Sequence, residues 1–332
     1  MTGWRIVCDV GGTNVRYARC AADRSLSDVV ARPLSDSPDC GVALLDDLRA
    51  YRDRFPDGAM LNDAVIAAAG PIDQGVVRLT NRDQVISADA TSRVLGGVPV
   101  SLLNDLEAVA LSLPWLPETG LRPIFAPLAP LRGPRLVVNI GTGFGGALLF
   151  ATAAGWHAVA CEPGHMTCPA PAEPAIDMSS RRMFMSVEDM LSGAALRTPQ
   201  TIARKWNLAL PAGFPDDATD LLAHYASAPD GAKFIRLFSA LLGRICGDLV
   251  LACGAWGGVH LSGSVASAWF RHGDLEEFLA AFIDKGPMAA RMSRVELHQI
   301  IEPFPALIGL CHVRSAAVSG SSTPSDQNMR SS

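Results

Sequence analysis

The chain has 332 residues, of which 49% are hydrophobic and 18% are charged. These values are ordinary for a globular protein, and the length is sufficient for two domains of typical size. Lysine and arginine total 28 against 33 acidic residues, so the net charge is -5, and no long basic run is present. A nucleic-acid backbone is therefore excluded as the main partner, and we expect a small-molecule substrate.

The eight cysteines are scattered without a Cys-x-x-Cys pair, and residues 1–5 lack the basic-then-apolar form of a signal peptide. The most apolar long segment, residues 237–261, is interrupted by Arg244, Asp248 and several glycines. It therefore predicts a buried helix followed by a strand, and no membrane span. We expect a cytoplasmic protein with reduced thiols and no membrane partner.

In chain order, the first half predicts an alternation of strands and helices, which is typical of the α/β class. Strands are predicted at residues 5–10, 15–20, 64–69 and 98–103, with a helix at 41–55 and a polar, loop-rich stretch at 71–90.

Residues 114–134 are rich in proline and predict a crossing between two domains. A second α/β unit is then expected from a strand at 136–140, through a helix-rich middle, to a strand at 258–262. Both units open with a strand, a glycine turn and another strand.

The first of four motifs lies at the turn of the first predicted hairpin. It comprises Asp9, Val10, Gly11, Gly12, Thr13 and Asn14. Two glycines allow a backbone turn to approach a phosphate, the Thr13 hydroxyl is a further donor, and Asp9 could hold a hydrated Mg²⁺. The alternative is a tight hairpin whose glycines only satisfy positive φ. A Walker loop is excluded because no Gly-Lys-Ser/Thr follows.

The second motif, residues 139–146 (NIGTGFGG), contains Gly141, Thr142 and Gly143 and also satisfies the dinucleotide pattern G-x-G-x-x-G. A dinucleotide site needs these glycines to open a helix, whereas the apolar residues 147–151 predict a strand. We therefore favour a second glycine hairpin that binds a polyphosphate, and keep a dehydrogenase as an alternative.

The third motif is Asn104-Asp105, where a predicted strand ends and a helix begins. Either residue could be only a helix N-cap. In the functional alternative, a carboxylate at the carboxyl end of a strand lies where open α/β sheets bind ligands, and accepts a proton from a substrate hydroxyl.

The fourth motif joins Glu162 and His165, three residues apart around a proline and a glycine, with Glu188 further along the chain. Such acceptors and donors suit the adjacent hydroxyl groups of a sugar. A zinc site is the alternative, but Cys161, Glu162, His165 and Cys168 lack the usual zinc spacing.

These motifs, in this order, resemble the bacterial glucokinase family within the hexokinase and actin superfamily. The resemblance covers nearly the whole chain and includes a C-terminal motif, residues 257–264, whose Gly263 and Ser264 correspond to the adenosine side. It implies that Asp105 is the catalytic base, and that Asn104, Asp105, Glu162, His165 and Glu188 hold the sugar.

The resemblance also implies ATP and Mg²⁺, with Asp9 on the metal through water, and no structural zinc. It implies a two-lobed actin-like ATPase (ribonuclease H-like) α/β fold with the active site in the interlobe cleft. The expected division is a small lobe of residues 1–114 plus about 303–319, a large lobe of 115–302, and a disordered tail of 320–332. Related enzymes are often homodimers, so we expect one here.

Three departures from the family pattern bear on specificity: Pro163 replaces a glycine, Gly263-Ser264 replaces Gly-Gly, and Ala194-Ala195 replaces Pro-Gly. Proline fixes φ and removes a donor, so Pro163 affects where Glu162 lies relative to the sugar. The implied function is phosphorylation of glucose at its 6-hydroxyl by ATP. The alternatives are a kinase for another hexose and a non-catalytic sugar sensor.

Overall fold

The structure is a computed structural model. It describes residues 3–12, 14–34, 40–55, 60–79, 84–169, 185–198, 202, 206, 208–209 and 220–314. The chain divides into two compact units, one formed by residues up to Asp105 together with the segment from Leu310, the other by Leu106–Gly309. The lobe boundaries expected from the sequence, at 114/115 and near 303, stay a prediction. The expected tail, residues 320–332, lies outside the described residues.

The first unit contains a five-stranded sheet in the order β3-β2-β1-β4-β8. Its strands are β1 (Trp4–Val10), β2 (Asn14–Cys20), β3 (Leu26–Pro33), β4 (Leu61–Ala68) and β8 (Val100–Asn104). Strands β1, β2 and β3 are antiparallel neighbours, whereas β4 and β8 run parallel to β1. Ile6 and Ile66, which are fully buried, come from neighbouring parallel strands and lie in the core cluster of this unit.

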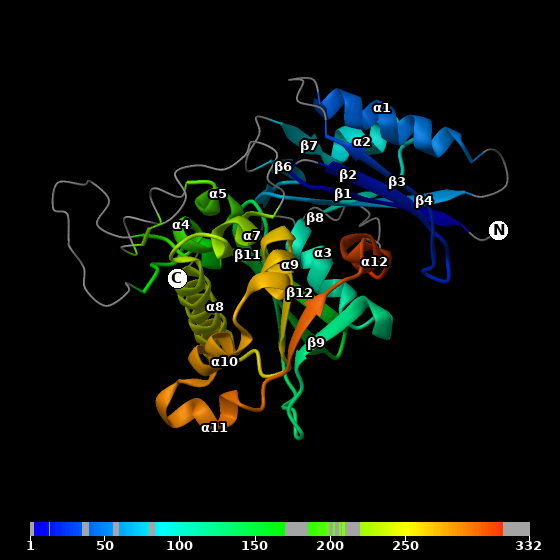
Figure 1. The fold of residues 1–332 in the computed structure, drawn as a ribbon. Coiled ribbons are helices and arrows are strands. Elements are labelled where there is room, and N and C mark those ends of the chain that lie inside the picture. The colour runs from blue at the N-terminus through cyan, green and yellow to red at the C-terminus, as the bar shows by residue number, and fades with distance from the viewer. Residues whose placement is uncertain are drawn as a thin grey trace, which may run out of the picture. The chain divides into compact units, whose positions relative to one another are not determined.

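Two helices accompany this sheet, α1 (Cys40–Asp53) and α2 (Ala88–Val94), and they lie near one another in Figure 1. Helix α1 buries Leu44, Leu48 and Tyr51 in the same cluster as the β1 and β4 side chains, as expected for an amphipathic helix covering a sheet. Helix α2 starts where the Ser87 hydroxyl accepts a hydrogen bond of 3.3 Å from the Ala90 amide.

Between β4 and α2 the structure contains a small antiparallel sheet, where the sequence predicted only loops. Its strands are β5 (Ile72–Asp73), β6 (Val76–Arg78) and β7 (Val85–Ser87). Strands of two or three residues are too short to show a hydrophobic period, which is why the sequence pattern missed them.

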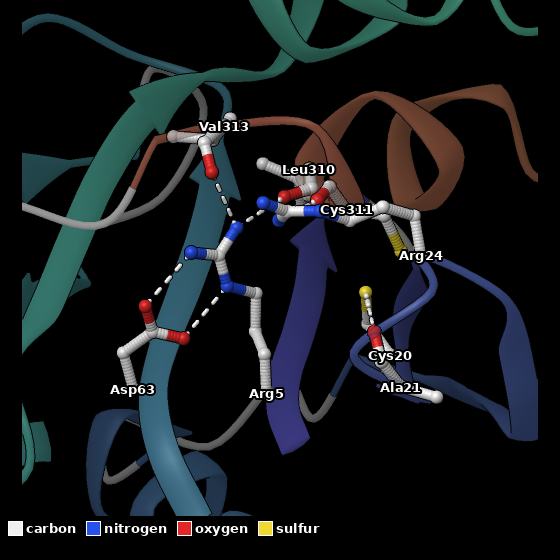
Figure 2. Close-up of polar contacts among 8 residues, drawn as sticks. All are labelled: Arg5, Cys20, Ala21, Arg24, Asp63, Leu310, Cys311 and Val313. Atoms are coloured by element: carbon white, nitrogen blue, oxygen red, sulfur yellow. Dashed lines mark hydrogen bonds and ion pairs between the residues drawn. The ribbon is translucent and has the colours of Figure 1, made fainter. Parts of the chain in front are cut away.

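The segment from Leu310, which starts in the last turn of α12 (Pro305–Cys311), returns to the first unit, where Arg5 and Arg24 donate hydrogen bonds to its backbone (Figure 2). Arg5 forms an ion pair with Asp63, through contacts of 2.6 and 2.7 Å, and both residues are only 5% exposed. The same guanidinium donates to the carbonyl oxygens of Leu310 at 3.1 Å and Val313 at 2.6 Å. Asp63 holds the Arg5 guanidinium in place, and Arg5 in turn holds the returning backbone. Removing Asp63 would leave the buried guanidinium without its carboxylate and weaken this attachment.

The second unit contains a six-stranded sheet in the order β12-β11-β10-β13-β14-β9. Its strands are β9 (Leu121–Phe125), β10 (Arg135–Ile140), β11 (Phe144–Thr152), β12 (Gly155–Cys161), β13 (Val259–Ser262) and β14 (Leu297–Ile300). Strands β10, β11 and β12 are antiparallel, and β13 and β14 run parallel to β10. This repeats the arrangement of the first unit, and the glycine turn again joins the first two strands.

Strand β9 lies in the proline-rich stretch that the sequence interpreted only as a crossing. It pairs antiparallel with β14 at the edge of the sheet and contains Pro123. Proline has no N–H to donate, and an edge strand is the place in a sheet that tolerates it.

The helices of the second unit are α3 (Asp105–Ser112), α4 (Glu188–Leu191), α5 (Gly193–Leu196), α7 (Leu221–Ala226), α8 (Gly231–Cys253), α9 (Ser264–His272), α10 (Leu275–Ile283) and α11 (Ala289–Met292). Short 3-10 turns occur at Glu118–Gly120, Pro163–His165 and Gly286–Met288. Helix α8 carries a buried stripe and packs beside α10 (Figure 1). Gly247 permits this close contact, because a Cβ at this position would lie only 2.7 Å from the Phe282 carbonyl oxygen.

No helix among the described residues is both long and apolar enough to cross a membrane.

Candidate active site

The predicted site residues fall into two sets, one on each unit. The first unit carries the turn at residues 9–14 and the Asn104-Asp105 pair. The second unit carries the Gly141 turn, the Glu162 to His165 element, Glu188, and Gly263-Ser264.

The first glycine turn joins β1 to β2, whose last and first residues pair at Val10 and Val15. The Gly11 amide donates to the Asn14 carbonyl at 3.0 Å. Neither Gly11 nor Gly12 has positive φ. A Cβ at Gly12 would meet none of the described atoms within 4 Å. The hairpin conformation therefore does not require glycine at position 12, whereas close approach of a ligand would require it. Thr13 lies outside the described residues.

Asp9, one residue before the end of β1, forms an ion pair with Arg16 of β2, with Oδ2 and Nη1 3.2 Å apart. The Asp9 side chain is 14% exposed. Burial raises the pKa of this carboxyl, and the charge of Arg16 and its hydrogen bond oppose the rise. A carboxylate at a strand end that keeps some exposure fits a hydrated Mg²⁺ held through water.

Asn104 ends β8 and Asp105 begins α3. Across the parallel strands, Val10 pairs with Ala68, and Ala68 pairs with Asn104. The start of the glycine turn and the Asn104-Asp105 pair therefore lie at the same carboxyl edge of one sheet. Two strand spacings separate them, or roughly 10 Å. This edge is where open α/β sheets bind ligands.

The second glycine turn, between β10 and β11, is held by the backbone of α5. The Gly193 amide donates to the Gly141 carbonyl at 2.8 Å, and the Ala194 amide donates to the Thr142 carbonyl at 3.0 Å. The turn also closes on itself, since the Gly141 amide donates to the Gly143 carbonyl at 3.1 Å. A strand follows it, as the sequence predicted, so the helix that a dinucleotide-binding loop needs is missing from this place.

Gly263 lies against the base of this turn, with a φ of +97°. A Cβ here would collide with the Ile140 carbonyl oxygen and lie 2.8 Å from Oδ1 of Asn139. That oxygen accepts a hydrogen bond of 3.0 Å from the Ser262 hydroxyl. Position 263 therefore requires glycine for both its φ and its packing.

A pocket of about 220 Å³ opens beside the second turn. Its lining comprises Gly141, Thr142, Gly193, Ala194, Leu196, Arg197, Leu222, Ser264, Val265 and Ala268. Leucine, valine and alanine side chains form an apolar wall that suits a purine base, whereas Thr142 and Ser264 offer hydroxyl groups. Three of the predicted nucleotide residues, Gly141, Thr142 and Ser264, thus meet in one pocket. Arg197, which belongs to none of the four sequence motifs, supplies a positive charge.

The Glu162 to His165 element is a 3-10 turn that follows β12 directly. Pro163 takes its first position, where a missing N–H is tolerated, so the proline that departs from the family pattern fits the turn. Pro163 and Gly164 are buried, and the side chains of Glu162 and His165 are exposed. The two exposed groups are therefore available to a ligand.

Glu188 begins α4, and its carboxylate accepts a hydrogen bond of 2.8 Å from the Phe144 amide in the second turn. A Cβ at Gly143 would lie 2.7 Å from the same oxygen, and one at Gly164 would lie 3.3 Å from it. The structure thus joins Glu188 to the second turn and to the Glu162 to His165 element. The described residues contain no group of three or more potential metal ligands.

Solved structures define the class of this fold. The chain matches a glucokinase from an Antarctic psychrotroph with a TM-score of 0.74 and 26% identity, over 92% of this chain and 97% of that one. A glucokinase from Balamuthia mandrillaris, solved in complex with glucose, matches in fold with a TM-score of 0.72 and 20% identity, over 93% and 92%. The expected α/β class and actin-like fold are confirmed, and the class is that of the sugar kinases.

The sequence comparisons narrow this class. The Glucokinase family model matches residues 6–317. A glucokinase of Nitrobacter hamburgensis is 33% identical over 94% of this chain and 98% of its own length, and one of Chromobacterium violaceum is 31% identical over 92% and 88%. The chain belongs to the glucokinase family.

Proposed function

We propose that this protein transfers the γ-phosphoryl group of ATP to the 6-hydroxyl of glucose, and that Asp105 is the general base. The observation that carries the proposal is the register across β1, β4 and β8. It brings Asn104-Asp105 to the same sheet edge as the Gly11 turn, so a proton acceptor and a phosphate-sized backbone turn share one edge. A dehydrogenase is not supported, because a strand follows the Gly141 turn.

In this proposal Asp105 accepts the proton of the glucose 6-hydroxyl while the oxygen of that hydroxyl attacks the γ-phosphorus. The bond between the γ-phosphorus and the bridging oxygen breaks, and ADP leaves. Phosphoryl transfer needs little covalent chemistry from the protein, so positioning and charge neutralisation account for most of the catalysis. When bound, Mg²⁺ neutralises the developing charge on the phosphates, and Asp9 would hold it through water.

Glu162, His165 and Glu188 are the proposed partners of the remaining sugar hydroxyls, together with Asn104. The pocket bordered by Thr142 and Ser264 is the proposed place of the adenosine, and Gly263, which precedes Ser264, packs against the strand that leads into the Gly141 turn. The turn at residues 9–14 would bind phosphate through its backbone, together with the Gly141 turn. The exposed side chains of Glu162 and His165, the open space beside Gly12, and the pocket lined by Thr142 and Ser264 support these roles.

A coupled assay with ATP and a panel of glucose, mannose, fructose and N-acetylated sugars tests this function. We expect phosphorylation of glucose with the highest kcat/KM of the panel. A higher kcat/KM for another hexose would change the substrate and keep the kinase. Binding of sugar without phosphorylation of any member would favour the sensor. A homodimer and a cytoplasmic location remain predictions, and light scattering of the purified protein tests the first.

A further inference from the structure

The first turn of helix α3 is docked on the strands of the second unit by two consecutive side chains. A Cβ at Gly145 of β11 would lie 2.6 Å from Cδ1 of Leu106, so this glycine leaves room for the leucine. The next residue, Glu107, accepts a hydrogen bond of 3.2 Å at Oε1 from the Ala160 amide of β12. The helix that begins with Asp105 is therefore fixed to β11 by packing and to β12 by a hydrogen bond.

The Ala160 amide lies on an edge strand, so its acceptor, Glu107, comes from outside the sheet. Strand β12 is the edge of the six-stranded sheet and pairs only with β11 among the described strands. An edge strand presents backbone N–H groups that the ladder does not use. A carboxylate is a strong acceptor for such a group, because a hydrogen bond to an ionised oxygen is roughly twice as strong as a neutral one.

The position of this bond along the chain relates it to the proposed chemistry. Glu107 follows Asp105 by two residues in the same helix, and Ala160 precedes Glu162 by two residues. Beyond Ala160, the chain is held at Gly164, where a Cβ would collide with the Phe144 carbonyl oxygen. The residues that lead to Glu162 are thus attached on both sides of β12, to β11 through the ladder that runs to Cys161 and to α3 through Glu107.

We propose that Glu107 is a positioning residue, which holds the strand leading to Glu162 on helix α3 and so fixes where the sugar-binding carboxylate lies within the second unit. The inference rests on the proposed function. Glu107 acts through the Ala160 backbone and needs no contact with substrate. Its effect should therefore appear in glucose binding and turnover, and hardly in nucleotide binding.

Steady-state kinetics of Glu107→Ala, Glu107→Gln and Glu107→Asp, with glucose and ATP varied separately, test the proposal. In Glu107→Ala we expect the KM for glucose to rise about tenfold and kcat to fall severalfold, because small displacements of catalytic groups are costly. The KM for ATP should stay within about twofold. Glu107→Gln keeps an acceptor oxygen at the same place and should restore near-normal values, whereas Glu107→Asp moves the acceptor back and should not. Exposed Glu118 offers a matched control, Glu118→Ala, with normal kinetics.

Unchanged glucose kinetics in both Glu107→Ala and Glu107→Asp would overturn the proposal. So would a joint rise of both KM values together with a lower Tm, since that pattern indicates a general structural role. If Glu107→Ala does not fold, the glucose kinetics of Glu107→Gln and Glu107→Asp test the proposal without it. Both side chains are polar, and only the glutamine is long enough to place its oxygen where Oε1 of Glu107 lies. Failure of the proposed function is a separate result, in which the unaltered protein phosphorylates no sugar of the panel.

Discussion

The carboxylate of Glu188 accepts a 2.8 Å hydrogen bond from the backbone amide of Phe144. One oxygen atom thus supports the second glycine turn and borders Gly164 of the Glu162 to His165 element. A residue that the sequence assigned to the sugar alone is also part of the structure that shapes the proposed phosphate site.

Glu188→Ala should therefore impair the use of both substrates. We expect kcat/KM to fall by about 100-fold for glucose and about tenfold for ATP, since the variant loses a sugar contact and leaves the Phe144 amide without its acceptor. Glu188→Gln keeps an oxygen for that amide and should recover most of the ATP kinetics. Initial rates with each substrate varied in turn measure the split. A defect confined to glucose in Glu188→Ala would contradict the dual role.

Asp105→Asn should abolish turnover while glucose affinity stays within about tenfold, because a base acts in the transition state and ground-state contacts remain. Turnover is measured by the coupled assay, and glucose affinity by calorimetry on the same preparation. Near-normal turnover of this variant would exclude Asp105 as the base.

Gly12→Ala separates a ligand-binding turn from a merely structural one. A Cβ at this position meets none of the described atoms within 4 Å, and φ is not positive, so the fold should lose less than about 0.5 kcal/mol. The KM for ATP should nevertheless rise at least about tenfold, because the added methyl occupies the space that a phosphate would approach. Unchanged Tm together with unchanged KM for ATP would show that the turn does not bind the nucleotide.

Gly309→Ala makes the same substitution at a glycine that has no room for a Cβ. A Cβ at Gly309 of α12 would collide with the carbonyl oxygen of Ala108 in α3 and lie 3.0 Å from the Ser112 amide nitrogen. Backbone atoms cannot rotate away, so the two helices must separate, at a cost of about 3 kcal/mol. Urea denaturation should show a lower midpoint, with Gly12→Ala as the control. An unaltered midpoint would mean that the helices shift apart freely.

Acid should destabilise the protein through His260. This side chain is 4% exposed, stacks on His298 with ring centroids 5.2 Å apart, and has no described partner for Nδ1. Burial, followed by the charges of His298 and Arg135, lowers the pKa of His260 to about 3.

Because the folded pKa of His260 lies below its ordinary value of about 6.5, the unfolded chain binds more protons between these values. Stability contributed by the neutral ring is complete above pH 6.5 and decreases as the pH falls toward 3, by on the order of 2 kcal/mol at pH 5. His260→Leu should flatten the dependence of Tm on pH in this range, whereas substitution of exposed His157 should not. Equal slopes in all three proteins would refute the assignment.

Much of the fold could be predicted from the sequence because its signals are local. The apolar runs at 5–10, 15–20 and 136–140 and the glycine turns between strands specify elements through neighbouring residues alone. Strand β9 could not be predicted in this way, since it depends on pairing with β14, far along the chain, and contains Pro123. Glu107 and Arg197 were missed for a similar reason, because their partners lie on other elements.

The amino-acid sequence by itself determined the family, the glycine turns, and the identity of the candidate side chains, including Asp105 and Glu188. Only the tertiary structure decided which of them meet. It aligned Asn104 with Val10 through strand register, joined Glu188 to Phe144, and gathered Thr142 and Ser264 around one pocket. The physical reason is that turn geometry and strand propensity act over a few neighbouring residues. Register, burial and hydrogen bonds between elements arise only when the chain packs.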